Sequence, residues 1–351
     1  MSRYKAPFPY FGGKQRIASI VWQALGDISA YIEPFAGSLA VLLGRPESFA
    51  GVETVNDADG LICNFWRALK AKPHLVAQHA DWPVNENDLH ARHAWLVGKK
   101  DSLQARLEGN PHYYDAKVAG WWVWGMACWI GSDFCSGKGP WQIVASNGDR
   151  QLIHLGNAGQ GVQRQRVHLC NTGNGVQRKR VHLGNAGQGE AGLGEQGLLA
   201  WMEALARRLA RVRICCGDWT RICGGRTGDA LSHFFIAGLP CGIFLDPPYS
   251  SEADREMGCY RVDDGDVAHA VREWALRHGD DRRLRIVFAG YDGEHQMPKR
   301  WRCVAWKSKG GMSNQAKGDS RAKDNCHRER LWLSPYCLDV TEHLPAFARA
   351  A

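Results

Sequence analysis

The chain has 351 residues, of which 44% are hydrophobic, and a formal net charge of +8. That length is too great for one small domain and suits a large α/β domain with an insertion, or two domains. The positive charge suits a polyanionic partner without proving one. The most apolar stretch, at 121–130, is shorter than the roughly 18 residues of a membrane span, so we expect no membrane association.

The first 70 residues predict two α/β units. Helical spacing of apolar residues at 15–25 precedes a short strand at 31–37 that ends in a glycine turn. A helix at 38–44, a strand with an acidic tip at 54–57 and a helix at 60–70 follow. Strands that alternate with helices imply a mainly parallel sheet, whose ligand sites lie beyond the carboxyl ends of the strands.

The pattern changes between 71 and 196. Helices are predicted at 86–108 and 115–130, and a 14-residue repeat follows at 154–189. Each repeat joins strand-like alternation to a Gly/Asn turn, which indicates short strands connected by tight turns. We interpret 71–196 as an inserted target-recognition region.

The α/β pattern resumes after 197, so 1–70 and 197–351 together form the predicted main domain. Its expected helices lie at 198–212 and 266–279. Its expected strands lie at 213–219, 241–249 and 283–291, with an antiparallel pair at 302–308 and 329–335.

The strongest local signal is Asp246-Pro247-Pro248-Tyr249, at the end of a buried strand. Adjacent prolines cannot continue a sheet ladder, and an Asp there would be costly if it were only part of the core. The rigid prolines fix where the Asp246 carboxylate and the neighbouring carbonyl point, and Tyr249 offers a flat ring. An acceptor pair beside a stacking ring is what binding the exocyclic amino group of a flipped-out base requires.

Three weaker motifs each have a plain structural alternative. Glu33 and Gly37 flank a glycine turn that lets a ligand approach the backbone, although such turns are common. Asp57 is positioned to bind a ribose. The structural alternative is that Asp57 or Asp59 caps the following helix. The stretch PYFGGK that ends at Lys14 could hold a carboxylate, or be only a turn; it is not a P-loop.

In combination and in order, these motifs resemble the Dam-like (D12 class) DNA adenine methyltransferases, over most of the chain outside the repeat. The resemblance implies that Tyr10 and Lys14 contact the methionine part of the cofactor. It implies a first cofactor motif at Glu33, Phe35 and Gly37, in which Leu39 replaces the usual glycine. The remaining cofactor contacts are the ribose ligand Asp57, the adenine-binding pair Asp218 and Trp219, with Trp in place of the usual Phe, and Asp246 itself.

The resemblance implies a Rossmann-like class I methyltransferase sheet with an inserted recognition region. The expected reaction moves a methyl group from S-adenosylmethionine to the N6 amine of adenine in DNA, by base flipping, and leaves S-adenosylhomocysteine. The catalytic residues would be Asp246, Pro247, Pro248 and Tyr249. The enzyme would be cytoplasmic and nucleoid-associated, bacterial or phage-encoded, with no obligate protein partner.

Basic residues in two segments are candidates for phosphate contacts, which supply affinity without sequence information. A solvated basic ribbon or a mobile loop is the alternative. The recognition region would also place Trp129 and the four residues after it near the flipped base, although a core helix explains them equally well. The candidate DNA-binding residues are Arg164, Arg166, Arg178, Lys179, Arg180, Lys307, Lys309 and Arg321.

No metal is expected, and the cysteines predict no disulfides. Twelve cysteines are scattered without a framework spacing, and no secretory leader precedes the first motif, so we expect reduced thiols. His154, His168 and His182 recur through the repeat, and no Cys–His spacing supports zinc.

Several alternative functions stay open at this level. Methylation of the exocyclic amine of cytosine would use the same kind of binding pocket, but family members with that activity more often carry Ser in place of Asp246. Methylation of RNA or of a protein glutamine, and a catalytically silent DNA-binding protein, are further rivals. A Gly-rich insertion that offers mainly phosphate contacts is compatible with relaxed specificity for adenine in a short or degenerate sequence.

Overall fold

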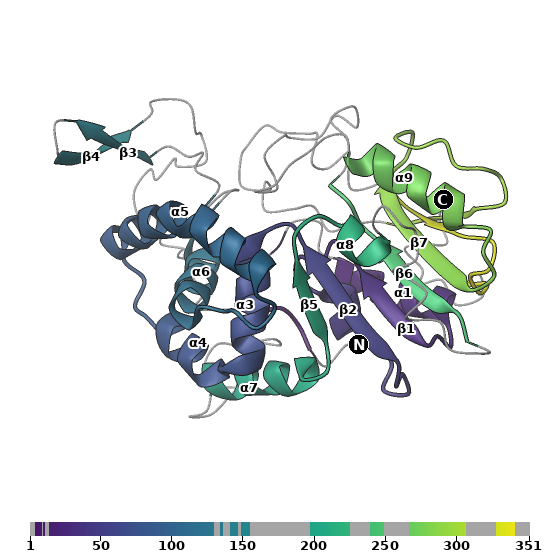
Figure 1. The fold of residues 1–351 in the computed structure, drawn as a ribbon, viewed down its shortest axis with the longest axis horizontal. Coiled ribbons are helices and arrows are strands. Elements are labelled where there is room, and N and C mark those ends of the chain that lie inside the picture. The colour runs from purple at the N-terminus through teal and green to yellow at the C-terminus, as the bar shows by residue number, and fades with distance from the viewer. Residues whose placement is uncertain are drawn as a thin grey trace, which may run out of the picture.

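The computed structural model describes residues 4–8, 10, 14–129, 134–135, 141–146, 149–154, 197–224, 239–248, 267–306 and 328–340. These residues form an α/β fold around a mixed, mostly parallel sheet of seven strands, compatible with a Rossmann-like arrangement (Figure 1). The strand order is β5-β2-β1-β6-β7-β9-β8. The strands are β1 (Ala30–Glu33), β2 (Val52–Asp57), β5 (Arg213–Cys216), β6 (Cys241–Leu245), β7 (Leu284–Tyr291), β8 (Arg302–Ala305) and β9 (Glu329–Leu333).

The first five strands of that order are parallel to one another, and β9 pairs antiparallel with both β7 and β8. The predicted final antiparallel pair is therefore confirmed. Because β9 runs against the others, its first residue lies opposite the last residue of β7, at the edge where the parallel strands end. An acidic residue at the start of β9 thus reaches the same edge as the loops that follow the parallel strands.

Helices cover both faces of the sheet (Figure 1). Alternate residues of the central strands β1, β6 and β7 enter two separate hydrophobic clusters, as the two-residue period of a strand requires. Tyr31 and Phe244 pack with α1 (Ala18–Leu25) and α3 (Gly60–Ala71) on one face. Ile32 and Ile243 pack with α8 (Thr220–Cys223) and α9 (Val267–His278) on the other. The one-turn helices η1 (Lys14–Arg16) and α2 (Ala40–Leu43) complete the main domain.

None of the seven strands comes from 71–196, where the described residues form mainly helices. These helices are α4 (Pro73–Ala80), α5 (Glu86–Gly109) and α6 (Ala116–Cys128). They lie beyond the β5 edge of the sheet with α7 (Gly197–Leu209), and the hairpin β3 (Trp141–Ser146) and β4 (Asp149–His154) extends from them (Figure 1). The predicted helices at 86–108 and 115–130 are confirmed; α4, α8 and η1 were not predicted. The repeat after His154 lies outside the described residues.

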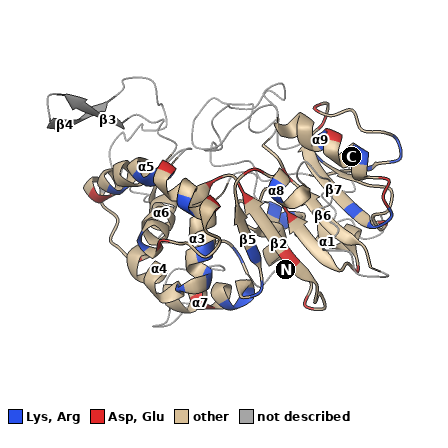
Figure 2. Ribbon diagram, viewed as in Figure 1, with Lys and Arg blue, Asp and Glu red and all other residues tan. Residues whose placement is uncertain are grey.

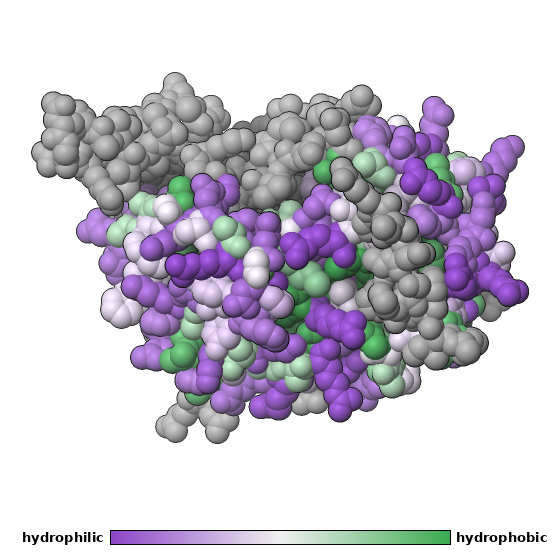
Figure 3. Space-filling view, in the orientation of Figure 1, coloured by the Kyte–Doolittle hydropathy of each residue, from purple (hydrophilic) through white to green (hydrophobic). Residues whose placement is uncertain are grey.

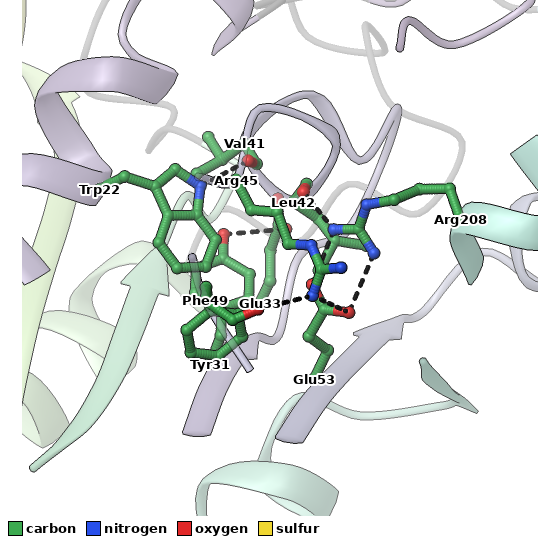
Figure 4. A network of polar contacts seen from close by, with 9 residues as sticks. All are labelled: Trp22, Tyr31, Glu33, Val41, Leu42, Arg45, Phe49, Glu53 and Arg208. Atoms are coloured by element: carbon green, nitrogen blue, oxygen red, sulfur yellow. Dashed lines mark hydrogen bonds and ion pairs between the residues drawn. The ribbon is translucent and has the colours of Figure 1, made fainter. Parts of the chain in front are cut away.

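A buried ion pair joins α7 to the main sheet (Figure 4). The Arg208 guanidinium donates to both carboxylate oxygens of Glu53 on β2, at 2.9 and 2.7 Å, and to the carbonyl of Leu42. Both charged side chains are 5% exposed. This contact fixes the chain as it returns from the insertion to the sheet.

Charged residues of both signs are interspersed over the described elements in the ribbon of Figure 2. Hydrophilic residues cover most of the described surface on the same face, with small apolar areas between them (Figure 3). Within the described part of the chain, no helix has the length and apolar character needed to cross a bilayer.

Candidate functional site

The described residues of the predicted cofactor and Asp-Pro-Pro motifs gather at the carboxyl ends of the parallel strands. Strands β1 and β6 are neighbours, and from them the strand order runs in opposite directions along the chain, through β2 and β5 on one side and through β7 on the other. A crevice at such a switch point is where open α/β sheets bind ligands. Glu33 is the last residue of β1, and Asp246 follows the last residue of β6, so both carboxylates flank this point.

The glycine loop after β1 is held by the end of β2. The Gly37 amide donates to Asp57 Oδ2 at 2.8 Å, and the Ala36 amide donates to the carbonyl of Asn56 at 2.9 Å. Gly37 has φ of 45°, in the left-handed region that favours glycine. A Cβ atom on Gly37 would lie 2.5 Å from Cε1 of Tyr10, so the N-terminal motif packs directly on the glycine loop.

Leu39 occupies the position where the resemblance expects glycine, and it has a glycine-like backbone. Its φ is 54° and its side chain is fully buried. A left-handed conformation costs a non-glycine residue roughly 1–2 kcal/mol, so burial of the leucine must offset that strain. The replacement of the expected glycine by Leu39 therefore changes the side chain but retains a left-handed backbone conformation.

The structure separates the two roles that the sequence allowed for the acids after β2. Asp59 is the cap of α3, and its Oδ1 accepts from the amides of Leu61 and Ile62 at 2.7 and 3.4 Å. Asp57 Oδ1 accepts from the amide of Asp59 at 2.8 Å, while its other oxygen holds Gly37. Asp57 therefore organises the glycine loop instead of capping the helix, and ribose binding stays a prediction for it.

The loop after β5 approaches the same loops. The Asn56 side-chain amide donates to the carbonyls of Pro34 and Gly217 at 3.2 and 2.9 Å, which ties three strand ends together. Oδ1 of Asn56 is buried and accepts no hydrogen bond in the described structure. The rings of Phe35 and Trp219 face each other, with centroids 6.4 Å apart and planes 31° apart. Asp218, beside Trp219, is exposed and accepts from the Thr220 amide at 2.9 Å.

Lys14 joins the N-terminal motif to the Asp-Pro-Pro motif. Its Nζ lies 3.1 Å from Asp246 Oδ1 and 3.8 Å from Glu329 Oε2, and 5.6 Å from the centre of the Trp306 ring. Burial alone would lower the pKa of Lys14, but the two carboxylates outweigh it and hold the pKa above its ordinary value of 10.5. Burial raises the pKa of Asp246, and the Lys14 ammonium opposes part of that rise. The Asp246 side chain nonetheless keeps 19% of its surface exposed.

Glu33 lies deeper than its predicted cation-binding role suggested. It is 3% exposed, and its Oε2 accepts a hydrogen bond from the Tyr31 hydroxyl at 3.0 Å. Burial raises the pKa of Glu33 well above its ordinary value of 4.5, with Asp246 and Asp57 adding to the rise and the Tyr31 hydrogen bond opposing it. The carboxyl group is thus poised to be neutral in the protein as it stands.

Some predicted residues are outside the described part of the chain. Pro247 is buried and Pro248 half-buried after β6, where the description stops before Tyr249. Trp129 stacks on His93 of α5, with ring centroids 5.0 Å apart and planes 9° apart, and the four residues after it are not described. The candidate DNA-binding residues outside the described ranges are Arg164, Arg166, Arg178, Lys179, Arg180, Lys307, Lys309 and Arg321.

Sequence reasoning missed Glu329 and Trp306, which contribute to the environment of Lys14. The available signal was an acid at the start of a mostly apolar strand that was expected to pair antiparallel. Glu329 is 3% exposed, and a buried carboxylate needs a partner. The position of β9 between β7 and β8 was required to see that this partner is Lys14.

Among the described residues, no group of three or more His, Cys, Asp and Glu side chains is arranged to hold a metal ion. A comparison with protein-family models found no match for the chain, and a comparison with curated proteins found no similar sequence. The candidate site is therefore defined by its geometry alone. It is the acidic edge of a parallel sheet, with the glycine loop after β1 and with Asp246 in an ion pair at the switch point.

Proposed function

We propose that this chain is an S-adenosylmethionine-dependent methyltransferase that modifies the N6 amine of adenine in DNA. The observation that carries the proposal is the position of Asp246-Pro247-Pro248 at the switch point, beside the glycine loop and its acidic neighbours. The motifs that suggested this chemistry are distant in the sequence, yet they meet at one edge of the sheet. Turns without a shared function would not be expected to lie together at that edge.

The sheet order supports the same proposal. The parallel strands β5, β2, β1, β6 and β7, with helices on both faces, are compatible with the Rossmann-like sheet that the resemblance implies. The predicted recognition region enters between β2 and β5, so all the site loops remain on the main domain.

The described residues fit the cofactor chemically. Asp57 and Asp246 make the edge acidic, which suits a ligand that carries a sulfonium and an ammonium group. The unpartnered buried oxygen of Asn56 is an acceptor beside the glycine loop, and the Phe35 and Trp219 rings, which the resemblance assigns to the cofactor motifs, lie close to each other. When bound, S-adenosylmethionine supplies a methyl group from a sulfur that keeps the electron pair of the broken bond.

The protein's own part in the reaction is to activate a poor nucleophile. The lone pair of the adenine amine is conjugated into the ring, so it must be drawn toward tetrahedral geometry before it can attack. Asp246 and the carbonyl of Pro247 would accept the two amino hydrogens, and Tyr249 would stack on the extruded base, which contributes roughly 1–3 kcal/mol. Burial raises the pKa of Asp246, so its carboxylate can also accept the proton that the methylated nitrogen must lose.

The test is a labelled-methyl transfer assay on plasmid DNA, followed by nucleoside analysis of the product. We expect N6-methyladenine from the wild type and a loss of at least about a thousandfold in Asp246→Ala, because the acceptor of the amino hydrogens is removed. Calorimetry should show that this variant still binds the cofactor.

The exposed Asp292, on the loop after β7, provides the control; Asp292→Ala should methylate at the wild-type rate. Methylated cytosine in the product, transfer only to RNA, or transfer unchanged by Asp246→Ala would each contradict the proposal.

A further inference from the structure

Asn56, on β2, uses both hydrogens of its side-chain amide to hold the loops on either side of that strand. Its Nδ2 atom donates to the carbonyl of Pro34, after β1, at 3.2 Å and to the carbonyl of Gly217, after β5, at 2.9 Å. Asn56 is 1% exposed, so water does not compete for these bonds. A hydroxyl has only one hydrogen to donate and a carboxylate has none, so few other side chains could make both bonds.

The same residue holds the chain on both sides of Phe35. The carbonyl of Pro34 accepts from the Asn56 side chain, and the Ala36 amide donates to the main-chain carbonyl of Asn56 at 2.9 Å. The residues before and after Phe35 are therefore bonded to one residue of β2. These two bonds fix the backbone of Phe35 relative to that strand.

Gly217 is held by the same end of β2. Its carbonyl accepts from the Asn56 side chain, and its amide donates to the carbonyl of Asp57 at 2.9 Å. Gly217 lies two residues before Trp219, whose ring centroid is 6.4 Å from that of Phe35. Consecutive residues of β2 thus set the separation of the two loops that carry these rings.

The other end of the Asn56 side chain makes no bond that stabilises the fold. Its Oδ1 atom is buried and accepts no hydrogen bond in the described structure, which costs folding free energy. Oγ1 of Thr54, two residues earlier on the same face of β2, is also buried and has no hydrogen-bond partner. The two residues share a strand face and deep burial, but only the side chain of Asn56 is hydrogen-bonded to the loops.

We propose, on the basis of the function proposed above, that Asn56 is a positioning residue for the nucleoside part of the cofactor. It acts by fixing the separation of the Phe35 and Trp219 loops, which the resemblance assigns to the cofactor motifs. The side chain need not touch the ligand for this role. Without the two donated bonds the loops are less ordered, and ordering them again on binding weakens the affinity.

Calorimetry with S-adenosylhomocysteine and with 5′-methylthioadenosine, which lacks the amino-acid part, tests this role. Asn56→Ala should weaken the binding of both by about tenfold, because both contain the nucleoside. Thr54→Val is the matched control on the same strand face and should bind both ligands as the wild type does. Unchanged binding in Asn56→Ala, or a loss for S-adenosylhomocysteine alone, would overturn the proposal.

Asn56→Asp separates the donated bonds from a general structural role. Its ionised carboxylate would repel both carbonyl oxygens, whereas its protonated form can donate to one of them. Burial favours the protonated form, so the affinity of Asn56→Asp relative to Asn56→Ala should rise at least about threefold as the pH falls from 8 to 5. Both variants keep the neighbouring Asp57, Cys63 and Asp218, whose own titration cancels in this ratio. A ratio that does not change with pH would refute the role of the donated bonds.

Urea unfolding shows whether each variant is folded. If Asn56→Ala does not fold, Asn56→Ser, which keeps one donor, replaces it with a smaller expected loss of affinity. Failure of both variants to fold would show that the side chain serves the fold alone, and would overturn the proposal. If the wild type binds neither ligand, the proposed function fails, whereas equal binding by the wild type and Asn56→Ala refutes only the role of Asn56.

Discussion

Glu33 illustrates at the residue scale how burial changes what a motif residue can do. The sequence placed an acid beside a glycine turn, where it was expected to meet a cation. In the structure it is 3% exposed and hydrogen-bonded to Tyr31, which itself stacks on Trp22 with ring centroids 4.6 Å apart. Because burial raises the pKa of Glu33, ionisation of this carboxyl group is unfavourable in the folded protein without a ligand.

Glu33→Gln should therefore change the pH dependence of stability. The unfolded carboxyl ionises near 4.5, whereas the folded one stays protonated to a higher pH. As the pH rises through this window, ionisation stabilises only the unfolded state, so the wild-type free energy of unfolding falls by up to about 1.4 kcal/mol per pH unit. Glu33→Gln lacks this fall, so its stability relative to the wild type should rise with pH.

Urea unfolding of both proteins between pH 4.5 and 7, without cofactor, measures this difference. The exposed Glu47→Gln is the control and should follow the wild type at every pH. A difference between wild type and Glu33→Gln that stays constant with pH would show that Glu33 ionises normally in the folded state.

At the scale of elements, the chain uses a buried charge pair to anchor α7 after the insertion. Arg208 binds Glu53 through two nitrogens, and Arg45 reaches the same carboxylate at 3.4 Å (Figure 4). The two-point geometry suits a guanidinium better than an ammonium. The neighbouring Arg207 instead pairs with Glu203 on the surface of the same helix, at 4.0 Å.

Arg208→Ala should destabilise the protein by roughly 3–5 kcal/mol, because Glu53 would remain buried with only the longer contact to Arg45. Thermal unfolding measures the loss. Arg207→Ala removes an exposed pair and should change stability by less than about 0.5 kcal/mol, so it is the matched control on the same helix. Equal effects of the two substitutions would contradict a structural role for the buried pair.

At the scale of the whole molecule, the net charge of +8 is unevenly distributed. The described elements carry charges of both signs (Figure 2), whereas residues 151–189 contain five Arg or Lys and no Asp or Glu. The predicted nucleic-acid contacts therefore fall in segments outside the described ranges, and they remain a prediction from composition. A polyanion is nevertheless the partner that this distribution suits.

Neutralising Lys307, Lys309 and Arg321 together should flatten the salt dependence of DNA binding. Each lost phosphate contact reduces the slope of log affinity against log salt by about 0.9, so the triple variant should lose roughly 2.7. Fluorescence anisotropy on a duplex at several salt concentrations measures the slope. Neutralising Arg282, Arg300 and Lys299 on the described surface is the control for net charge alone. An equal loss in both triple variants would show that the basic segment makes no specific phosphate contacts.

The sequence by itself determined the strands of the main sheet, most of the helices and the positions of the motifs at strand ends, because periodicity and turn residues act over a few neighbours. It predicted every strand of the main sheet, and it placed Asp57 at the end of β2 and Gly37 and Asp246 on the loops that follow β1 and β6. It left the capping role open between Asp57 and Asp59, since both precede the same helix.

Only the tertiary structure decided which side chains share a charge. Lys14 and Glu329 lie near opposite ends of the chain, and no local pattern pairs them. Their contact depends on β9 running antiparallel between β7 and β8, which carries an acid to the edge where the parallel strands end. Electrostatic partners are set by distance in space and by burial, and a sequence pattern specifies neither until the strand order is known.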